Sequence, residues 1–424
     1  MDRYDTLYRL YETFDTDDLR ANQTFVDLLP PIDAPVARES WETARADVDD
    51  GKHTIEEAFA DAEDRLGSVL AAVAAHADRE TAFAALDVYS AHERPIDALV
   101  LDVDETLRAT GTTDNEIPRE TLALLTKLHD EGMPIVVCTG QTLENVKGFT
   151  IQGLGNELVH SGRFSIVYES GNGVFTAGHG ADTKRLLYEE LDEEIRTVFR
   201  EVRSGALSAA PEEVRRGCHL QGNEFNVTLK PNFEAGTDEA DAVIDLALVH
   251  VIDLLGRTVA ETAGVDADGA DAAAWARAHY AASDPEIEAV LAEEGALPTD
   301  EATVPEAVRA LFERIDVGYY EADAAEITSL ELDKVAGVEA ALEVLGVADP
   351  FVLVLGDSKS DLRVMEWAER NDHGIAAAPE HASEAVLEHV RSTSDLVFSP
   401  GAAAVPLRFV YALNQLARLD GHER

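Results

Sequence analysis

The residues best suited to chemistry lie in one short run, ALVLDVDET, from Ala98 to Thr106. Four apolar residues are followed by Asp102 and, one residue further on, Asp104. An apolar run of this length is typical of a strand covered on both faces, although its periodicity also fits a short buried helical segment. At the carboxyl end of such a strand, side chains face the crevice in which open α/β sheets bind ligands. The sequence therefore predicts a functional site at Asp102 and Asp104.

The Asp-x-Asp spacing alone does not identify a site, because the chain is rich in aspartate. The same spacing occurs at three other places, which are Asp15 and Asp17, Asp47 and Asp49, and Asp266 and Asp268. Those pairs lie in polar surroundings that are typical of a solvated surface. Only the pair at Asp102 directly follows an apolar strand, and this context favours a functional role for it.

A second apolar run, Ile135 to Cys138, ends in Thr139. Before it, Pro118 can open a helix and Gly132 can close one. Strand, helix and strand at this length form a unit in which the two strands are parallel and the crossover is right-handed. We therefore expect Thr139 to leave the sheet at the same edge as Asp102.

A third apolar run, Phe351 to Leu355, ends in the sequence GDSKSD, which contains Asp357 and Asp361. A helix should follow, and shorter apolar runs at Gly374 to Ala376 and at Leu396 to Phe398 continue the alternation of strands and helices. This pattern is typical of a parallel α/β sheet. It predicts that these aspartates join Asp102 and Asp104 at one sheet edge.

Clustered carboxylates repel one another and are costly to ionise side by side. A divalent cation relieves this repulsion, and Mg²⁺ suits a site that offers a few carboxylates, a backbone carbonyl, waters and a substrate phosphate oxygen. Hydroxyl and lysine donors at the same edge suit the remaining phosphate oxygens. The residue types therefore predict a Mg²⁺-dependent phosphoryl-transfer site.

The order DVDET, CTGQ, a lysine and GDSKSD resembles the four motifs of the haloacid dehalogenase superfamily. This resemblance implies a Rossmann-like core and the hydrolysis of phosphate esters through an aspartyl-phosphate. The large insertion after the second motif resembles the C2-type cap of the sugar-phosphate and Cof-like phosphatase branch. The resemblance covers residues 97–400, through motifs in the core and through position and size in the cap.

The resemblance also implies roles for individual residues. Asp102 would be the nucleophile, and Asp104 would act as general acid and then as general base. Thr139 would hydrogen-bond the transferring phosphoryl group. The Asp102 carboxylate, the backbone carbonyl of Asp104, Asp357 and Asp361 would bind or orient Mg²⁺.

The lysine of the third motif is assigned to Lys334, which stands before a helix that leads into the last catalytic strand. In this branch a glycine often follows the lysine directly, whereas here Gly337 comes three residues later. Lys359 and Lys230 are the alternatives. A lysine in this position would neutralise phosphate charge and stabilise the nucleophile loop.

Two other positions depart from the pattern of the branch. Glu105 stands where glycine is usual, and Gln141 stands where an arginine is common. Neither change removes an essential chemical group. In the insertion, the polar residues that could face a substrate are His219, Gln221, Asn223, Asn226 and Lys230.

The first 95 residues read as helical and contain no catalytic constellation. Thr54 and Glu57 have the spacing of a capping box, and apolar residues recur at helical spacing from Ile55 to Val73. The proline-containing stretch from Gln23 to Arg38 favours an irregular connector. We interpret the region as a helical accessory layer or an oligomerisation element, with substrate contact or regulation as alternatives.

The predicted fold is α/β, with a Rossmann-like parallel-sheet core, an inserted α+β cap domain and an N-terminal helical extension. The predicted boundaries are 1–95 for the helical region, 96–170 and 329–424 for the core, and 171–328 for the cap. Within the cap, the acidic run from Asp266 to Asp271 reads as a solvated loop.

The composition limits the classes of partner and the compartment. With 83 acidic and 34 basic residues among 424, the net charge is −49, which disfavours nucleic acid and anionic membranes and resembles proteins that work in concentrated salt. The two cysteines form no disulfide framework and no CxxC pair. Because neither a signal peptide nor a membrane-spanning run is visible, we expect a cytoplasmic protein.

The sequence therefore predicts a Mg²⁺-dependent phosphoric monoester hydrolase acting on a small phosphorylated metabolite, with a sugar phosphate as the leading candidate. One alternative is a phosphomutase or phosphotransferase that uses the same nucleophile. Another is a non-catalytic regulatory protein on the same fold, in which the N-terminal helices recruit a partner. A homo-oligomer formed through those helices is also a prediction.

Overall fold

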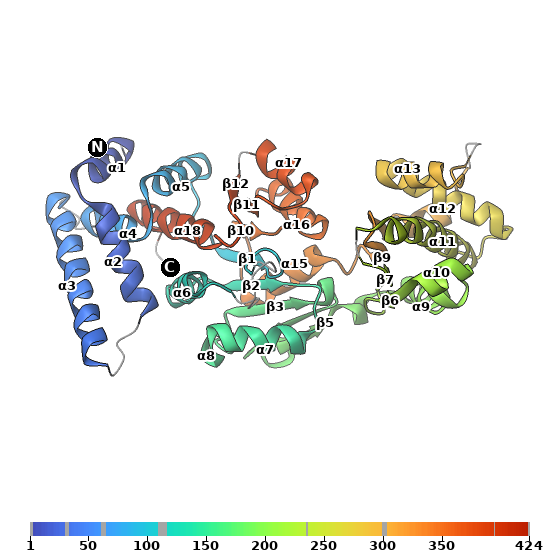
Figure 1. The fold of residues 1–424 in the computed structure, drawn as a ribbon, viewed down its shortest axis with the longest axis horizontal. Helices are drawn as coiled ribbons and strands as arrows, with labels where there is room; N and C mark the ends of the chain where they lie inside the picture. Colours follow the sequence, from blue (N-terminus) through green and yellow to red (C-terminus); the bar gives the residue numbers. More distant parts are fainter. Residues whose placement is uncertain are drawn as a thin grey trace. The chain divides into compact units, whose positions relative to one another are not determined.

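The computed structural model describes residues 3–29, 34–60, 65–108, 117–234, 236–298, 303–393 and 395–422. The chain folds into two compact units (Figure 1). Unit 1 comprises Met1–Tyr168, Val174–Arg185 and Val338–Arg424, and unit 2 comprises Glu169–Gly173 and Leu186–Gly337. None of the helices in the described ranges is both long enough and apolar enough to span a membrane.

Unit 1 is built on an eight-stranded sheet with the order β12-β11-β10-β1-β2-β3-β4-β5. The strands are β1 (Ala98–Asp102), β2 (Ile135–Cys138), β3 (Phe164–Tyr168), β4 (Gly173–Thr176), β5 (Lys184–Leu186), β10 (Val352–Leu355), β11 (Gly374–Pro379) and β12 (Leu396–Phe398). Strand β1 lies between β10 and β2 and runs parallel to both, so that Leu101 is in register with Leu355 and Val137. The predicted parallel-sheet core is therefore confirmed.

Helices connect the strands of this sheet or follow the last of them. They are α6 (Arg119–Asp130), α7 (Leu143–Leu154), α8 (Asn156–Val159), α15 (Lys334–Leu345), α16 (Lys359–Arg370), α17 (Glu384–Ser392) and α18 (Ala404–Ala417). Every residue of β1, β2, β3 and β10 is buried, as expected for mostly apolar strands that are covered on both faces. Helix α6 follows Pro118, and Gly132 after it has a φ of +99°, which glycine adopts without strain.

Five helices precede the sheet: α1 (Arg3–Thr13), α2 (Thr16–Leu28), α3 (Pro35–Ala58), α4 (Leu66–His76) and α5 (Arg79–His92). The predicted N-terminal helical extension is therefore confirmed. Helices α4 and α5 pack against α18 (Figure 1), and apolar residues of the extension share one core with the strands of unit 1. The extension is thus part of the hydrophobic core of unit 1.

Three local predictions in this extension are wrong. Thr54 lies inside α3, where its hydroxyl donates a hydrogen bond to the Asp50 carbonyl over 2.8 Å, so no helix begins there. The apolar stripe from Ile55 to Val73 is divided between α3 and α4. The expected connector from Gln23 to Arg38 is helical up to Leu28 and again from Pro35, while residues 30–33 lie outside the described ranges.

Unit 2 contains a four-stranded antiparallel sheet with the order β6-β7-β9-β8. The strands are β6 (Cys218–Gln221), β7 (Asn226–Pro231), β8 (Ile315–Tyr320) and β9 (Ala324–Ser329). The helices are α9 (Glu193–Ser208), α10 (Glu212–Gly217), α11 (Asp238–Thr262), α12 (Gly269–Ser283), α13 (Pro285–Glu293) and α14 (Glu306–Phe312). Strands and helices in one inserted unit confirm the predicted α+β character.

The boundaries of the units can be compared with the predicted cap, 171–328. The predicted cap and unit 2 share the stretch from Leu186 to residue 328, whereas Val174–Arg185 groups with unit 1. The acidic run from Asp266 to Asp271 is only partly a loop. Asp268 caps α12, and the residues after it form the first turn of that helix.

Candidate functional site

The strand order places three predicted site residues at one edge of the unit 1 sheet. Asp102 is the last residue of β1 and is in register with Cys138 of β2, so Thr139 follows at the neighbouring position. On the other side of β1, β10 ends at Leu355, and Asp357 follows it. Parallel pairing therefore brings these three residues to the same edge, because parallel strands end on the same side of a sheet.

Three carboxylates meet at this edge. Asp102, Asp357 and Asp361 each offer an oxygen, and the three oxygens lie within 4.8 Å of one another. The exposed fractions of Asp102 and Asp361 are only 7% and 3%, and Asp357 is half-buried. Buried carboxylates this close repel one another. Their oxygen donors fit a hard divalent cation such as Mg²⁺, which would relieve that repulsion.

Asp361 is fixed in place by the loop that precedes α16. Its Oδ2 accepts hydrogen bonds from the Ser358 hydroxyl over 2.6 Å, from the Ser358 N–H over 3.1 Å and from the Asp357 N–H over 3.3 Å. Ser358 is the N-cap of α16, and Asp361 completes a capping box with it. The same aspartate therefore caps a helix and contributes to the carboxylate cluster.

Gly356 makes this arrangement sterically possible. A Cβ atom at this position would lie 2.2 Å from the Asp361 Cβ and 2.5 Å from its Cγ. These separations are far below van der Waals contact. The glycine in GDSKSD is therefore required by the close approach of Asp361 to the end of β10.

Thr106 connects the first motif to the last one. Its hydroxyl donates a hydrogen bond to Asp357 Oδ1 over 3.1 Å, and its exposed fraction is 2%. The sequence alone does not predict a role for Thr106, because its partner lies 251 residues away along the chain. The one available signal was its place at the end of the run ALVLDVDET.

Asp104 lies near the same edge but outside the three-carboxylate cluster. Its Oδ1 accepts a hydrogen bond from Arg108 Nε over 2.9 Å, and its Oδ2 accepts one from Gln141 Nε2 over 2.7 Å. The Arg108 guanidinium in turn lies over the Phe149 ring, 4.9 Å from its centroid. Gln141, which departs from the pattern of the branch, therefore orients the predicted acid and base.

Thr139 is buried, with an exposed fraction of 1%. Its hydroxyl oxygen accepts a hydrogen bond from the Gln141 N–H over 3.1 Å. This leaves the hydroxyl hydrogen for donation to another oxygen. This hydrogen bond therefore fixes Thr139 and Gln141 relative to each other in the loop that follows β2.

Glu105, the other departure, adopts a φ of +60°. This left-handed conformation costs a non-glycine residue about 1 kcal/mol, which explains why glycine is common at this position in the branch. The Glu105 carbonyl forms a hydrogen bond with His381 Nε2 over 2.9 Å, from the loop after β11. The turn thus keeps a glycine-like shape through a contact with a neighbouring loop.

The lysines differ in their surroundings. Lys334 is the first residue of α15 and is 5% exposed, and Asp333 before it caps the helix by accepting from the Ala336 N–H over 2.9 Å. Lys334 falls in unit 2, whereas the carboxylates belong to unit 1, and its assignment stays a prediction. Lys230 lies on β7 and bonds both Asp323 oxygens over 3.0 Å, while Lys359 is the half-buried first residue of α16.

The polar residues proposed for substrate contact lie on the first two strands of the unit 2 sheet and in the turn between them. His219 Nδ1 bonds Asn232 over 2.9 Å, and Gln221 Nε2 bonds His219 Nε2 over 3.0 Å. The Asn223 amide donates to the Glu169 carbonyl over 3.2 Å. Their local bonds account for part of their hydrogen-bonding capacity, and a role in substrate recognition stays a prediction.

Comparison with known families supports the resemblance seen in the motifs. The family model of haloacid dehalogenase-like hydrolases matches residues 290–397, which include Lys334, Asp357 and Asp361. The resemblance to this superfamily is therefore confirmed in that stretch, while Asp102, Asp104 and Thr139 lie before it. No curated protein matches the chain.

Several solved structures resemble this one in fold. A Thermoplasma acidophilum protein, 0175, has 13% identity and a TM-score of 0.41 and covers 76% of this chain and 100% of its own. The HAD subclass IIB sugar phosphatase BT4131 has 17% identity and a TM-score of 0.39, with coverages of 72% and 94%. A haloacid dehalogenase-like hydrolase from Bacteroides thetaiotaomicron has 14% identity and a TM-score of 0.40, with coverages of 74% and 98%. At these identities and scores, the activities of those proteins do not transfer to this chain.

Proposed function

We propose that this protein is a Mg²⁺-dependent phosphoric monoester hydrolase that acts on a small phosphorylated metabolite through an aspartyl-phosphate. The observation that carries the proposal is the cluster of Asp102, Asp357 and Asp361, whose oxygens lie within 4.8 Å of one another at the end of β1 and β10. The match to haloacid dehalogenase-like hydrolases over residues 290–397 supports it.

The metal would be held by the Asp102, Asp357 and Asp361 carboxylates, with the backbone carbonyl of Asp104 as a further oxygen donor. A bound Mg²⁺ supplies positive charge that offsets the carboxylates and the substrate phosphate. Thr106 and Ser358 contribute by fixing the orientation of Asp357 and Asp361 through the hydrogen bonds described above.

In the first step, an Asp102 carboxylate oxygen attacks the phosphorus of the substrate. A phosphorus–oxygen bond to the Asp102 carboxylate forms, and the bond to the leaving alcohol oxygen breaks with its electron pair remaining on that oxygen. Asp104, in its protonated form, donates a proton to this oxygen. The division into two displacements lowers the barrier of each one.

In the second step, Asp104 accepts a proton from water, and the resulting oxygen attacks the phosphorus of the aspartyl-phosphate. The bond between phosphorus and the Asp102 oxygen breaks, which returns the carboxylate and releases inorganic phosphate. Arg108 and Gln141 hold the Asp104 carboxyl group from two sides and so set its direction for both proton transfers.

Two further side chains complete the proposal. The buried Thr139 hydroxyl donates to an oxygen of the transferring phosphoryl group, since the Gln141 N–H already occupies it as an acceptor. Lys334 neutralises phosphate charge in the role of the third-motif lysine. A sugar phosphate is the first substrate to examine, with specificity arising from the polar side chains on β6 and β7.

The test is phosphate release from a panel of phosphorylated sugars, glycolate, glycerate and nucleotides, in high KCl and with or without Mg²⁺. We expect Mg²⁺-dependent turnover that is lost in Asp102→Asn. Transfer of labelled phosphate to a second hydroxyl compound without release would instead identify a phosphotransferase or mutase. If the wild type binds Mg²⁺ but neither releases nor transfers phosphate from any compound, the proposal fails in favour of a regulatory role.

Two properties of the whole protein, its compartment and its oligomeric state, belong to the same proposal. The protein would work in the cytoplasm, where its acidic surface keeps it hydrated and away from nucleic acid. Its N-terminal helices would form a homo-oligomer. Sedimentation of the full chain in high KCl tests this oligomer, and a monomer at all concentrations would contradict it.

A further inference from the structure

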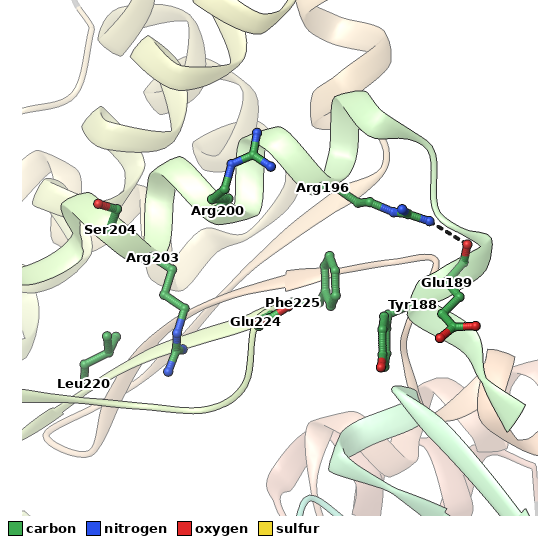
Figure 2. A pocket seen from close by; sticks show the side chains of 9 residues that line it. All are labelled: Tyr188, Glu189, Arg196, Arg200, Arg203, Ser204, Leu220, Glu224 and Phe225. Carbon is green, nitrogen blue, oxygen red and sulfur yellow. Dashed lines mark hydrogen bonds between the residues drawn. The ribbon is translucent and has the colours of Figure 1, made fainter. Parts of the chain in front are cut away.

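A pocket of about 610 Å³ lies within unit 2, apart in sequence from the carboxylate cluster (Figure 2). It is lined by helix α9, by the short 3-10 helix Leu187–Glu190 and by residues around the β6–β7 turn. The lining residues are Tyr188, Glu189, Arg196, Arg200, Arg203, Ser204, Leu220, Glu224 and Phe225. Its size is in the range that holds a small organic molecule.

Three of these residues are arginines from one face of α9. Arg196, Arg200 and Arg203 are spaced by four and three residues, which places them on the same side of a helix. In a chain with 34 basic and 83 acidic residues, this concentration of positive charge around one pocket is unexpected. The two acidic lining residues, Glu189 and Glu224, are both exposed.

The three arginines have different partners. Arg203 donates to the carbonyls of the β6–β7 turn, to Asn223 over 2.6 Å and to Gly222 over 3.4 Å, and so holds the turn that carries Phe225. Arg200 is exposed, forms surface ion pairs with Glu193 and Glu201, and points away from the aromatic rings (Figure 2). Arg203 therefore stabilises the β6–β7 turn, and Arg200 is paired with surface glutamates.

Arg196 uses only part of its hydrogen-bonding capacity within the protein. Its Nη2 donates to the Glu189 carbonyl over 2.5 Å, whereas the Glu189 carboxylate points away from it (Figure 2). Its Nε is buried and has no hydrogen-bond partner among the described residues. Arg196 also forms no ion pair with any of the described residues. Because no carboxylate of the described residues neutralises it, the Arg196 guanidinium is well suited to bind an oxyanion.

An aromatic pair lines the same pocket as Arg196. The rings of Tyr188 and Phe225 are nearly parallel, with 5.9 Å between centroids and 19° between planes. Phe225 is buried and also packs on Phe199, with 5.8 Å between centroids, which fixes its orientation. Tyr188, Phe225 and Leu220 give the pocket an apolar wall suited to a planar ring or a short hydrocarbon.

We infer that this pocket binds a small organic anion, with a phosphate or carboxylate group on Arg196 and a planar ring on Tyr188 and Phe225. The inference goes beyond the proposed hydrolase, because all lining residues belong to unit 2 and none belongs to the carboxylate cluster. An oxyanion on the Arg196 guanidinium gains a charge-assisted hydrogen bond, and the ring gains apolar contact. The site selects for both features together.

The test is calorimetric titration of the full chain with phenylphosphonate, benzoate and inorganic phosphate at constant KCl in EDTA, which removes divalent cations. Phenylphosphonate or benzoate should bind, and inorganic phosphate should bind at least about fivefold more weakly because it lacks the ring. Equal affinity for inorganic phosphate and phenylphosphonate would overturn the assignment of a ring site. The phosphonate and the carboxylate show which oxyanion is preferred.

Variants localise the binding. Arg196→Gln should weaken binding of the preferred anion at least about tenfold, since a charge-assisted hydrogen bond is lost, and Arg196→Lys should restore part of it. Tyr188→Leu should reduce the difference in affinity between the ring compound and inorganic phosphate, because the ring loses part of its apolar contact. The control is Arg216→Gln, an exposed arginine of α10 that pairs with Glu212. Unchanged affinity in Arg196→Gln with an unchanged melting temperature would overturn the inference.

Discussion

The end of β1 and the start of α12 carry the same Asp-x-Asp pattern with different consequences. At α12, Asp266 and Asp268 are exposed, and Asp268 accepts hydrogen bonds from the Ala270 and Asp271 N–H groups, both over 2.8 Å. At β1, Asp102 is buried beside two other carboxylates. An exposed aspartate stabilises a helix end, whereas a buried cluster requires a compensating cation or proton. A carboxylate at the end of a buried strand therefore differs in its role from one in an exposed loop before a helix.

The largest predicted effect tests this difference directly. Asp102→Asn should lower phosphate release at least about 10³-fold, because the amide cannot act as the nucleophile. Asp268→Asn should leave turnover unchanged, since asparagine also caps helices. Initial rates with the best substrate measure both variants. If the two variants lose activity equally, the buried Asp102 is no more important for turnover than the exposed Asp268, and its assignment as the nucleophile fails.

The carboxylates next to Asp102 should determine the affinity for metal. Asp357→Asn should raise the Mg²⁺ concentration for half-maximal activity about tenfold or more, because one charged oxygen donor is lost. A Mg²⁺ titration of activity provides the measurement, with Asp268→Asn as the matched control. An unchanged Mg²⁺ requirement would remove Asp357 from the metal site.

The packing around the cluster makes a prediction about stability. Gly356→Ala should cost about 1–3 kcal/mol of unfolding free energy and reduce activity, since the new Cβ would lie 2.2 Å from the Asp361 Cβ. Gly148→Ala is the control, because Gly148 lies within α7 with no atom of the surroundings within 4 Å of an added Cβ. That variant should be neutral or slightly stabilising. Urea unfolding in constant KCl compares them, and equal stability of the two variants would contradict the steric argument.

The orientation of Asp104 gives a smaller effect. Gln141→Leu removes the amide that donates to Asp104 Oδ2 and should lower kcat about tenfold, with a smaller change in KM. Gln152→Leu, at an exposed position of α7, is the control. Steady-state kinetics at several pH values separate the two variants. A change confined to KM would show that Gln141 contacts the substrate instead.

Burial should also distinguish the histidines, because it changes the pKa of an imidazole. Burial lowers the pKa of His250, whose Nε2 bonds the Ala206 carbonyl over 3.0 Å. As the pH falls, His250 therefore becomes protonated at a higher pH in the unfolded chain than in the folded one. The free energy of unfolding must then decrease as the pH falls through about 6.5.

The size of this last effect is set by the proton linkage. His250 should contribute a loss of up to about 1.4 kcal/mol between pH 7.5 and 5.5. Urea unfolding at the two pH values measures it, and His250→Gln should reduce the pH dependence by that amount. His160→Gln, at an exposed histidine of unit 1, is the control. An equal pH dependence in wild type and His250→Gln would contradict the assignment.

Much of the sheet could be predicted from local pattern. Strand β2 was predicted with its observed bounds, and β1 and β10 were predicted within a few residues, because a short apolar run between polar residues has few other solutions. Helix boundaries in the N-terminal region were less predictable. Thr54 and Glu57 match a capping box in spacing, but packing continues α3 through them.

The chain by itself determined which residues are available and the order in which they reach the sheet edge. The apolar strands, the aspartates after them and the glycine of GDSKSD are local features, and parallel connections follow from strand, helix and strand. Tertiary structure alone decided the contacts between distant residues. Folding brings together side chains that are far apart in the sequence, and their spacing along the chain does not predict these contacts. Examples are the hydrogen bond of Thr106 to Asp357, that of Gln141 to Asp104 and the arginine-lined pocket of unit 2.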